Sequence, residues 1–255
     1  MKKTEKTACL DRLHIILSEP KLSENIGSVA RACANMGCKH LHIVRSQPPD
    51  PALARKLATK QGEPILETMT LHPDLPSCLT PFHKVYGTTA RSGGWRKGIK
   101  TPARVAPDII DLLRTGQTVA IVFGPEDKGL TNAETEICSS LLTIPTTDDS
   151  SLNLSHAVLV TLYECFKQAL EQDFQPQRGN RQASPVTQAE YALLFTTIQE
   201  ALEGIDFLKA GTSSYFMLPV RRYLNRFTLY RNEFNMLMGI CRQILWLGKR
   251  ERKDR

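Results

Sequence analysis

Polar residues that could do chemistry gather in three segments of the chain, and the central one is VAIVFGPEDKGLTN, residues 119–132. Five apolar residues open it, as in a strand that is covered on both faces. Gly124 and Pro125 then end the strand, and Glu126 follows in a charged loop. In an open α/β sheet, ligands bind in such loops at the carboxyl ends of strands. Glu126 is therefore a candidate site residue, although an ordinary turn with solvated charges has the same pattern.

The second segment is a helix predicted over residues 24–36, where apolar residues recur at i, i+3, i+4 and i+7. Arg31 falls on the face opposite this apolar stripe, and Asn25 falls in the first turn, where a side chain can reach free backbone groups. Arginine is a permanent cation that can position a phosphate or stabilise a developing negative charge. A solvated surface charge is the simpler explanation of an exposed helix arginine.

The third segment is TDDSSLNLSHAVLVTLYE, residues 147–164, in which a polar loop runs into an apolar helix. Ser150, Ser151 and Asn153 crowd the predicted helix start. Free backbone N–H groups there bind acceptors and anions. Ordinary capping of the helix by a serine is again the simpler explanation.

Alternating strand and helix patterns predict the frame that positions these segments. Such alternation indicates an α/β fold, with a largely parallel sheet and helices on both of its faces. We expect strands at residues 13–17, 41–44, 65–71, 84–89, 119–123 and 141–144, and helices at residues 24–36, 51–59, 104–114 and 152–172.

The composition changes after this region, so we expect two domains. Residues 1–172 form the α/β domain, and residues 173–186 are a polar linker that carries proline and glycine. Residues 187–255 form a small helical domain in which basic residues outnumber acidic ones. An apolar stripe begins its first helix, and two more helices are predicted at residues 220–227 and 228–249.

The net charge and the cysteines indicate the kind of partner and the compartment that we expect for this protein. The net charge of +7 and the pI of about 9.1 are compatible with a nucleic-acid partner. The seven cysteines are scattered and lack a C-x-x-C motif, so we expect reduced thiols in a cytoplasmic protein. We expect no membrane span, since no apolar run approaches ~20 residues, and no secretory signal at the amino end.

Several cofactor motifs are missing from the sequence. No G-x-G-x-x-G follows the first strand, so nothing favours a nicotinamide site. Neither H-x-E nor H-E-x-x-H occurs, and the six histidines are dispersed. We therefore predict no metal site.

Taken together, the motifs resemble those of a known family. ENIGSVARACANMG, IVFGPEDKGLTN and SSLNLSHAVLVTLYE resemble the three ordered motifs of the SPOUT methyltransferases, in the branch that methylates RNA ribose 2′-hydroxyls. GTTARS at residues 87–92 and FMLPVRRYLNRFTLYRNEFNMLMGI near the carboxyl end resemble the TrmJ subgroup, which modifies position 32 in the tRNA anticodon loop. The resemblance spans residues 13–245.

This resemblance implies a fold, a cofactor and a set of site residues. It implies an α/β domain with a deep trefoil knot, a homodimer whose active site is completed near the subunit interface, S-adenosylmethionine as cofactor and tRNA as substrate. The residues implied in cofactor binding are Thr88, Thr89, Ala90, Gly124, Ile144, Ser150, Ser151 and Leu152. The residues implied in catalysis are Arg31, Asn25, Glu126, Asn153 and Ser151.

One departure from the subgroup concerns the loop after residue 90. TrmJ-like chains often carry a second arginine where this chain has Gly93, and Arg96 is the nearest substitute.

Three alternative functions stay open: 2′-O-methylation of ribosomal RNA or of another tRNA position, RNA binding without catalysis, and nucleotide-dependent oxidation and reduction.

Overall fold

The computed structural model describes residues 6–45, 47–90, 99–147, 151–171, 185–209 and 213–251. The chain divides into two compact units, residues 1–176 and 177–255. Each unit has its own buried core and is described here by itself. Within the described residues, no helix is both long and apolar enough to cross a membrane.

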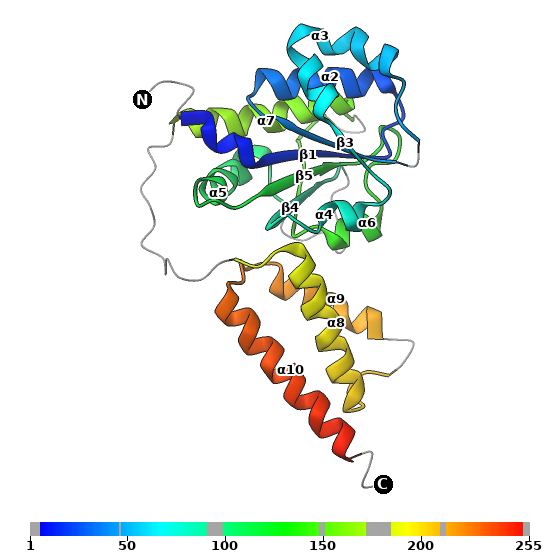
Figure 1. Ribbon diagram of the computed structural model, residues 1–255, viewed down its shortest axis with the longest axis vertical. Coiled ribbons are helices and arrows are strands. Elements are labelled where there is room, and N and C mark those ends of the chain that lie inside the picture. Colours follow the sequence, from blue (N-terminus) through cyan, green and yellow to red (C-terminus); the bar gives the residue numbers. More distant parts are fainter. Residues whose placement is uncertain are drawn as a thin grey trace. The chain divides into compact units, whose positions relative to one another are not determined.

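A six-stranded parallel sheet forms the centre of the first unit (Figure 1). The spatial order of the strands is β3-β2-β1-β5-β4-β6, so β1 and β5 lie in the middle. Every residue of β5 is buried, as its five-residue apolar run predicts. The strands are β1 (Leu13–Ser18), β2 (His40–Val44), β3 (Thr70–His72), β4 (Lys84–Thr88), β5 (Val119–Phe123) and β6 (Ser140–Leu142).

Helices cover both faces of this sheet, as predicted. One face packs against a large core that includes residues of η1 (Ala8–Arg12), α2 (Ser23–Asn35), α3 (Pro51–Thr68), α5 (Pro102–Arg114) and α7 (Leu154–Glu171). The other face packs against a smaller core under α4 (Leu75–Leu79) and α6 (Asn132–Ile137). Figure 1 shows α2, α3 and α7 together on one side of the sheet and α4 and α6 on the other.

Strand alternation decides which side chains enter which core. In β1, Leu13, Ile15 and Leu17 belong to the large core, whereas Ile16 belongs to the smaller one. This is the two-residue period of a strand. Both faces of the sheet are therefore buried. The loops at the carboxyl ends of its strands are left to form a site.

The strand predicted at residues 65–71 is present only from Thr70, so its predicted start is wrong. Residues up to Thr68 continue α3, which is interrupted at Thr59, where φ is 58° and ψ is 171°. Ile65 is buried as part of this helix, and β3 begins only at Thr70. Pro64 lies inside the second part of this helix.

The described part of the second unit holds three helices: α8 (Gln188–Gly204), α9 (Ser213–Leu224) and α10 (Arg231–Glu251). The predicted boundary at residue 220 is wrong, because Pro219 lies inside α9 and does not begin it. The Tyr191 hydroxyl donates to the Phe227 carbonyl at 2.9 Å and accepts from the Leu229 N–H at 3.0 Å. This tyrosine therefore fastens α8 to the segment between α9 and α10.

Most of the linker predicted at residues 173–186 lies outside the described residues, which resume at Pro185. Residues 91–98, in the loop after Ala90, also lie outside them. Pro185 pairs with Tyr230, and Val186 is buried with the core of the second unit. The path of the chain through residues 148–150 is likewise not described, and the knot stays a prediction of the resemblance.

Candidate active site

Three distant segments meet in a chain of hydrogen bonds at the carboxyl-terminal edge of the sheet. Asn25 donates from Nδ2 to Oε1 of Glu126 at 2.7 Å. Asn153 in turn donates from Nδ2 to Oδ1 of Asn25 at 3.1 Å. The sequence singled out all three residues in separate motifs, and the fold brings them into direct contact.

Backbone groups fix the two ends of this chain of hydrogen bonds. Oε2 of Glu126 accepts from the Lys21 N–H at 2.9 Å, in the turn between β1 and α2. Oδ1 of Asn153 accepts from the Ser155 N–H at 2.8 Å, which is the contact of a side chain that caps the start of α7. The cap of α7 is therefore Asn153 and not a serine, as the simpler explanation expected, and the same side chain also contacts Asn25.

Glu126 is held in its ionised form. Burial alone would raise the pKa of this carboxyl group, but the hydrogen bonds from Asn25 and from the backbone N–H groups of Lys21 and Leu22 lower it below its ordinary value. A carboxylate that already accepts these bonds at neutral pH orients its neighbours. This geometry favours a positioning role for Glu126 over that of a proton donor.

A pocket of about 260 Å³ opens beside Glu126. Its walls come from the segments after β4, β5 and β6 and from the start of α7. Seven of the eight residues implied in cofactor binding line it, and Ser150 lies outside the described residues. The seven are Thr88, Thr89, Ala90, Gly124, Ile144, Ser151 and Leu152.

Gly124 permits a very close approach of two backbone segments in the pocket wall. A Cβ atom at this position would lie 2.3 Å from the carbonyl carbon of Gly129 and 2.3 Å from the nitrogen of Leu130. A Cβ atom does not approach atoms to which it is not bonded so closely, so any side chain at this position would displace the loop. Glycine is thus required here for packing.

Arg31 lies apart from this pocket. Its side chain is exposed on α2 and is not among the residues that line the pocket. It makes no hydrogen bond or ion pair with the described part of the chain. Its backbone is held tightly instead, since a Cβ on Gly62 of α3 would lie 2.8 Å from the Arg31 nitrogen. Gly93 and Arg96 lie outside the described residues.

Sequence reasoning missed the apolar floor of the pocket and the ion pair at its rim. Phe123, Leu142 and Leu154 line the pocket while also belonging to the large core, so their pattern indicated only burial. Lys21 pairs with Asp127 at 2.6 Å, which fastens the β1–α2 turn to the loop after β5. The charged residues in the segments LSEPKLSEN and GPEDKG were the only sequence feature that could have suggested this ion pair.

Family models match both units of the chain. Residues 12–163 match the SpoU rRNA Methylase family, and residues 189–255 match the C-terminal domain of the tRNA methyltransferase TrmJ. The first match alone covers more than half of the chain. The chain therefore belongs to the SpoU methylase family, and its second domain and its full-length relatives place it in the TrmJ branch.

Individual relatives agree with this family. A tRNA (cytidine/uridine/adenosine-2′-O-)-methyltransferase TrmJ of Pseudomonas aeruginosa is 31% identical over 91% of this chain and 93% of its own length. A tRNA (cytidine-2′-O-)-methyltransferase TrmJ of Methanocaldococcus jannaschii is 32% identical over 64% of this chain and 70% of its own length. The crystal structure of TrmJ from Z. mobilis ZM4 superposes with a TM-score of 0.74 at 27% identity, over 91% of this chain and 98% of that one.

The class of enzyme follows from the family. The protein is an RNA 2′-O-methyltransferase, and methylases of this family use S-adenosylmethionine as the methyl donor. The fold class, the enzyme class and the cofactor predicted from the sequence are thereby confirmed.

Proposed function

We propose that this chain methylates the ribose 2′-hydroxyl of a cytidine or uridine at position 32, in the anticodon loop of tRNA. The observation that carries the proposal is the pocket after β4, β5 and β6, which adjoins the hydrogen-bonded residues Glu126, Asn25 and Asn153. The named TrmJ relatives act on tRNA, and position 32 rests on the resemblance to that subgroup.

The pocket suits S-adenosylmethionine by its composition. Its floor is apolar, its rim is polar and its wall has the close approach at Gly124, which are the features of a small-molecule site. We assign Thr88, Thr89, Ala90, Gly124, Ile144, Ser150, Ser151 and Leu152 to the cofactor. When bound, S-adenosylmethionine would supply the methyl group for the 2′-oxygen and become a neutral thioether, and the proton of the hydroxyl would pass to water.

The catalytic residues act on the ribose. A ribose hydroxyl is a poor nucleophile, so its oxygen must be aligned and its developing negative charge stabilised. We assign charge stabilisation to the guanidinium of Arg31, which stays protonated at neutral pH. Asn25, Glu126 and Asn153 fix the start of α2 and α7, and Ser151 lies at the rim of the pocket as a candidate contact to the ribose.

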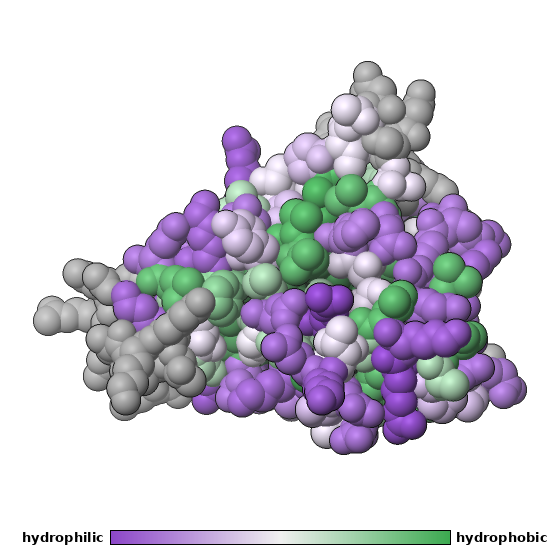
Figure 2. All heavy atoms as spheres, turned by 90° about the horizontal axis from the view of Figure 1, so that it is seen from above, coloured by the Kyte–Doolittle hydropathy of each residue, from purple (hydrophilic) through white to green (hydrophobic). Residues whose placement is uncertain are grey.

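The position of Arg31 outside the pocket of its own chain supports a homodimer. We propose that Arg31 serves the pocket of the partner subunit. Exposed apolar side chains on the same unit offer a surface for pairing: Leu22 is 55% exposed and Tyr163 of α7 is 51% exposed. Figure 2, which looks onto the side of α2 and α3, shows hydrophobic patches among hydrophilic side chains on this unit.

The second domain is the proposed tRNA clamp. Arg226 is exposed and makes no ion pair among the described side chains. Tyr223 and Phe227 beside it are 59% and 52% exposed, and aromatic rings can stack on unpaired bases. Arg231, in contrast, pairs with Glu190 inside the domain and is assigned a structural role. We place the enzyme in the cytoplasm with its tRNA substrate.

Deoxy substitution of the RNA tests the position directly. We would incubate the enzyme and labelled S-adenosylmethionine with an anticodon stem-loop, and with matched stem-loops that lack the 2′-hydroxyl at position 32 or at position 34. The proposal expects label in the first and third RNAs and none in the second. Label that survives the change at position 32 would move the target elsewhere. Failure to label these RNAs or total cellular RNA would favour an RNA-binding protein without catalysis.

A further inference from the structure

A row of histidines crosses the sheet beneath α4, on the face opposite α2 and α7. His14 lies in β1, His42 in β2 and His72 in β3, so neighbouring strands each contribute one ring. Cys78 of α4 is buried above this row and belongs to the smaller core. These side chains do not line the pocket beside Glu126, and the proposed methyl transfer makes no use of them.

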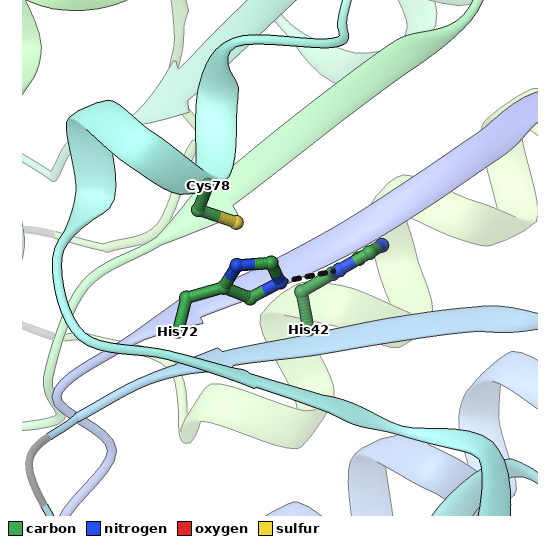
Figure 3. Close-up of side chains that lie close together, drawn as sticks. All are labelled: His42, His72 and Cys78. Atoms are coloured by element: carbon green, nitrogen blue, oxygen red, sulfur yellow. Dashed lines mark hydrogen bonds between the residues drawn. The ribbon is translucent and has the colours of Figure 1, made fainter.

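Three ligand atoms converge at one end of the row. Nδ1 of His42 lies 3.1 Å from Nε2 of His72. One ring nitrogen of His42, one of His72 and Sγ of Cys78 all lie within 4.8 Å of one another. Figure 3 shows the Cys78 side chain extending from α4 toward the His72 ring, with the His42 ring on the other side of His72. The Cys78 thiol makes no hydrogen bond with the described residues.

A fourth polar atom completes the group. The hydroxyl oxygen of Thr70 lies 2.6 Å from Nδ1 of His42 and 3.1 Å from Nε2 of His72. In a tetrahedral zinc site with Zn–N bonds of about 2.05 Å, neighbouring ligand atoms lie about 3.3 Å apart. The distance between the two nitrogens and that from the hydroxyl to His72 are close to this value, whereas the hydroxyl lies nearer to His42, at hydrogen-bond distance.

The second nitrogen of His42 has the partner that a metal ligand needs. Nε2 of His42 lies 2.9 Å from Nδ1 of His14, so a proton on Nε2 can be donated to His14 while Nδ1 presents its lone pair. Metal-binding histidines almost always donate their other N–H in this way, which fixes the ring and its tautomer. His14 is itself stacked on His40 at 4.3 Å between ring centroids.

We propose that His42, His72 and Cys78 bind a zinc ion, with the Thr70 hydroxyl or a water molecule as the fourth ligand. Two imidazoles and a thiolate form a ligand set that suits zinc. On binding, the Cys78 S–H bond breaks, its proton passes to solvent and the sulfur forms the bond to zinc. The ion would fasten the short edge strand β3 and the five-residue helix α4 to the sheet.

The sequence predicted no metal site, because the histidines are dispersed along the chain. The competing explanation of this cluster is a chain of hydrogen bonds between imidazole rings that binds no metal. The two explanations differ at Cys78. A relay from Thr70 through His42 to His14 does not need the thiol, whereas a zinc site loses a ligand without it. Substitution of Cys78 therefore separates them.

Metal content and cobalt spectroscopy of the full-length protein provide the test. After dialysis against a chelator, the protein would be titrated with zinc chloride against a colorimetric competitor, and separately with cobalt chloride. We expect one zinc ion per chain and a thiolate-to-cobalt charge-transfer band in the near ultraviolet. Cys78→Ser should abolish that band, and both Cys78→Ser and His72→Gln should weaken zinc binding at least tenfold.

Two matched variants control for nonspecific effects. Cys138→Ser changes another buried thiol of the same core, and His40→Gln changes the other histidine of β2, whose Nε2 contacts the Asp11 carbonyl. Both should bind zinc like the unmodified protein. Absence of the cobalt band from the unmodified protein, or equal zinc affinity in all four variants, would overturn the proposal. The cobalt spectrum of the unmodified protein decides the outcome even if a ligand variant fails to fold.

Discussion

Asn25 donates a 2.7 Å hydrogen bond to Glu126, although 101 residues separate the two in the chain. The same amide accepts from Asn153, so one buried side chain joins the starts of α2 and α7 to the loop after β5. The polar edge of the pocket is thus set by a single central residue. Removal of the Asn25 side chain should therefore break both hydrogen bonds at once.

Asn25→Ala should destabilise the protein and lower its activity. The substitution removes the 2.7 Å hydrogen bond to Oε1 of Glu126, which keeps only the longer bond from the Leu22 N–H at 3.5 Å, and it leaves Nδ2 of Asn153 without its partner. We expect this to cost about 1–3 kcal/mol, because the groups are partly buried. Urea unfolding would measure the loss. Asn35→Ala, at the exposed end of the same helix, is the control and should stay within about 0.5 kcal/mol of the unmodified protein. Equal stability of the two variants would show that the hydrogen-bonded chain contributes nothing.

Acidification should destabilise the protein partly through Glu126. Its pKa in the folded protein lies below the ordinary value of 4.5, so the folded state favours the ionised carboxylate. This contribution to stability is complete above pH 4.5 and is lost as the pH falls through the lowered pKa. We expect a smaller loss of stability between pH 6 and pH 3 in Glu126→Gln than in the unmodified protein, measured by urea unfolding. Glu136→Gln changes an exposed carboxyl group of the same unit and should keep the original pH dependence.

Much of this site could be predicted because local patterns determine it. The apolar run of β5 predicted a strand buried on both faces, and the structure confirms it. Loops at the carboxyl ends of parallel strands share one edge of a sheet, so the motif with Glu126 was expected to lie at a ligand site. Family resemblance supplied the residues of the pocket wall.

Long-range contacts could not be predicted in the same way. The bond between Asn25 and Glu126 depends on β1 lying beside β5, and the histidine row depends on the order β3-β2-β1. Strand alternation places His14 and His42 on one face only after this order is known. The second half of α3 was predicted as a strand because its short segment with Ile65 lacks a clear helical period, and tertiary packing decided the outcome.

Gly124→Ala should impair cofactor binding although it adds a single methyl group. The new atom would meet the backbone of Gly129 and Leu130, which cannot rotate away as a side chain can, so the loop must move. We expect the affinity for S-adenosylmethionine to fall at least tenfold, or about 1.4 kcal/mol, in calorimetry. Gly239→Ala, in a helix with open space around the glycine, should leave this affinity unchanged. Unaltered binding by folded Gly124→Ala would remove Gly124 from the cofactor site.

Arg226→Gln should weaken tRNA binding without affecting the cofactor. An exposed arginine that contacts a phosphate contributes through counterion release, so its loss should reduce the slope of log affinity against log salt by about one. Binding of labelled tRNA at several salt concentrations would measure this slope. Glu136→Gln serves as a control for surface substitution, and its salt slope should match that of the unmodified protein. A slope that Arg226→Gln leaves unchanged would exclude this residue from the phosphate contacts.

Arg31→Ala should reduce turnover by two or more powers of ten, about 3 kcal/mol of transition-state stabilisation. Stability and cofactor affinity should change little, because the Arg31 side chain is exposed and lies outside the pocket of its own chain.

Mixed dimers show whether Arg31 serves the pocket of its own chain or that of the partner subunit. In a dimer of one Arg31→Ala chain and one Gly124→Val chain, the intact pocket of the first receives Arg31 only from the second. If Arg31 acts across the interface, this dimer should recover roughly half of the original activity, since one of its two sites is complete. If Arg31 acts within its own chain, the mixed dimer should stay as inactive as its parents. Light scattering must report a dimer in every case, because loss of activity through dissociation would instead make Arg31 an interface residue.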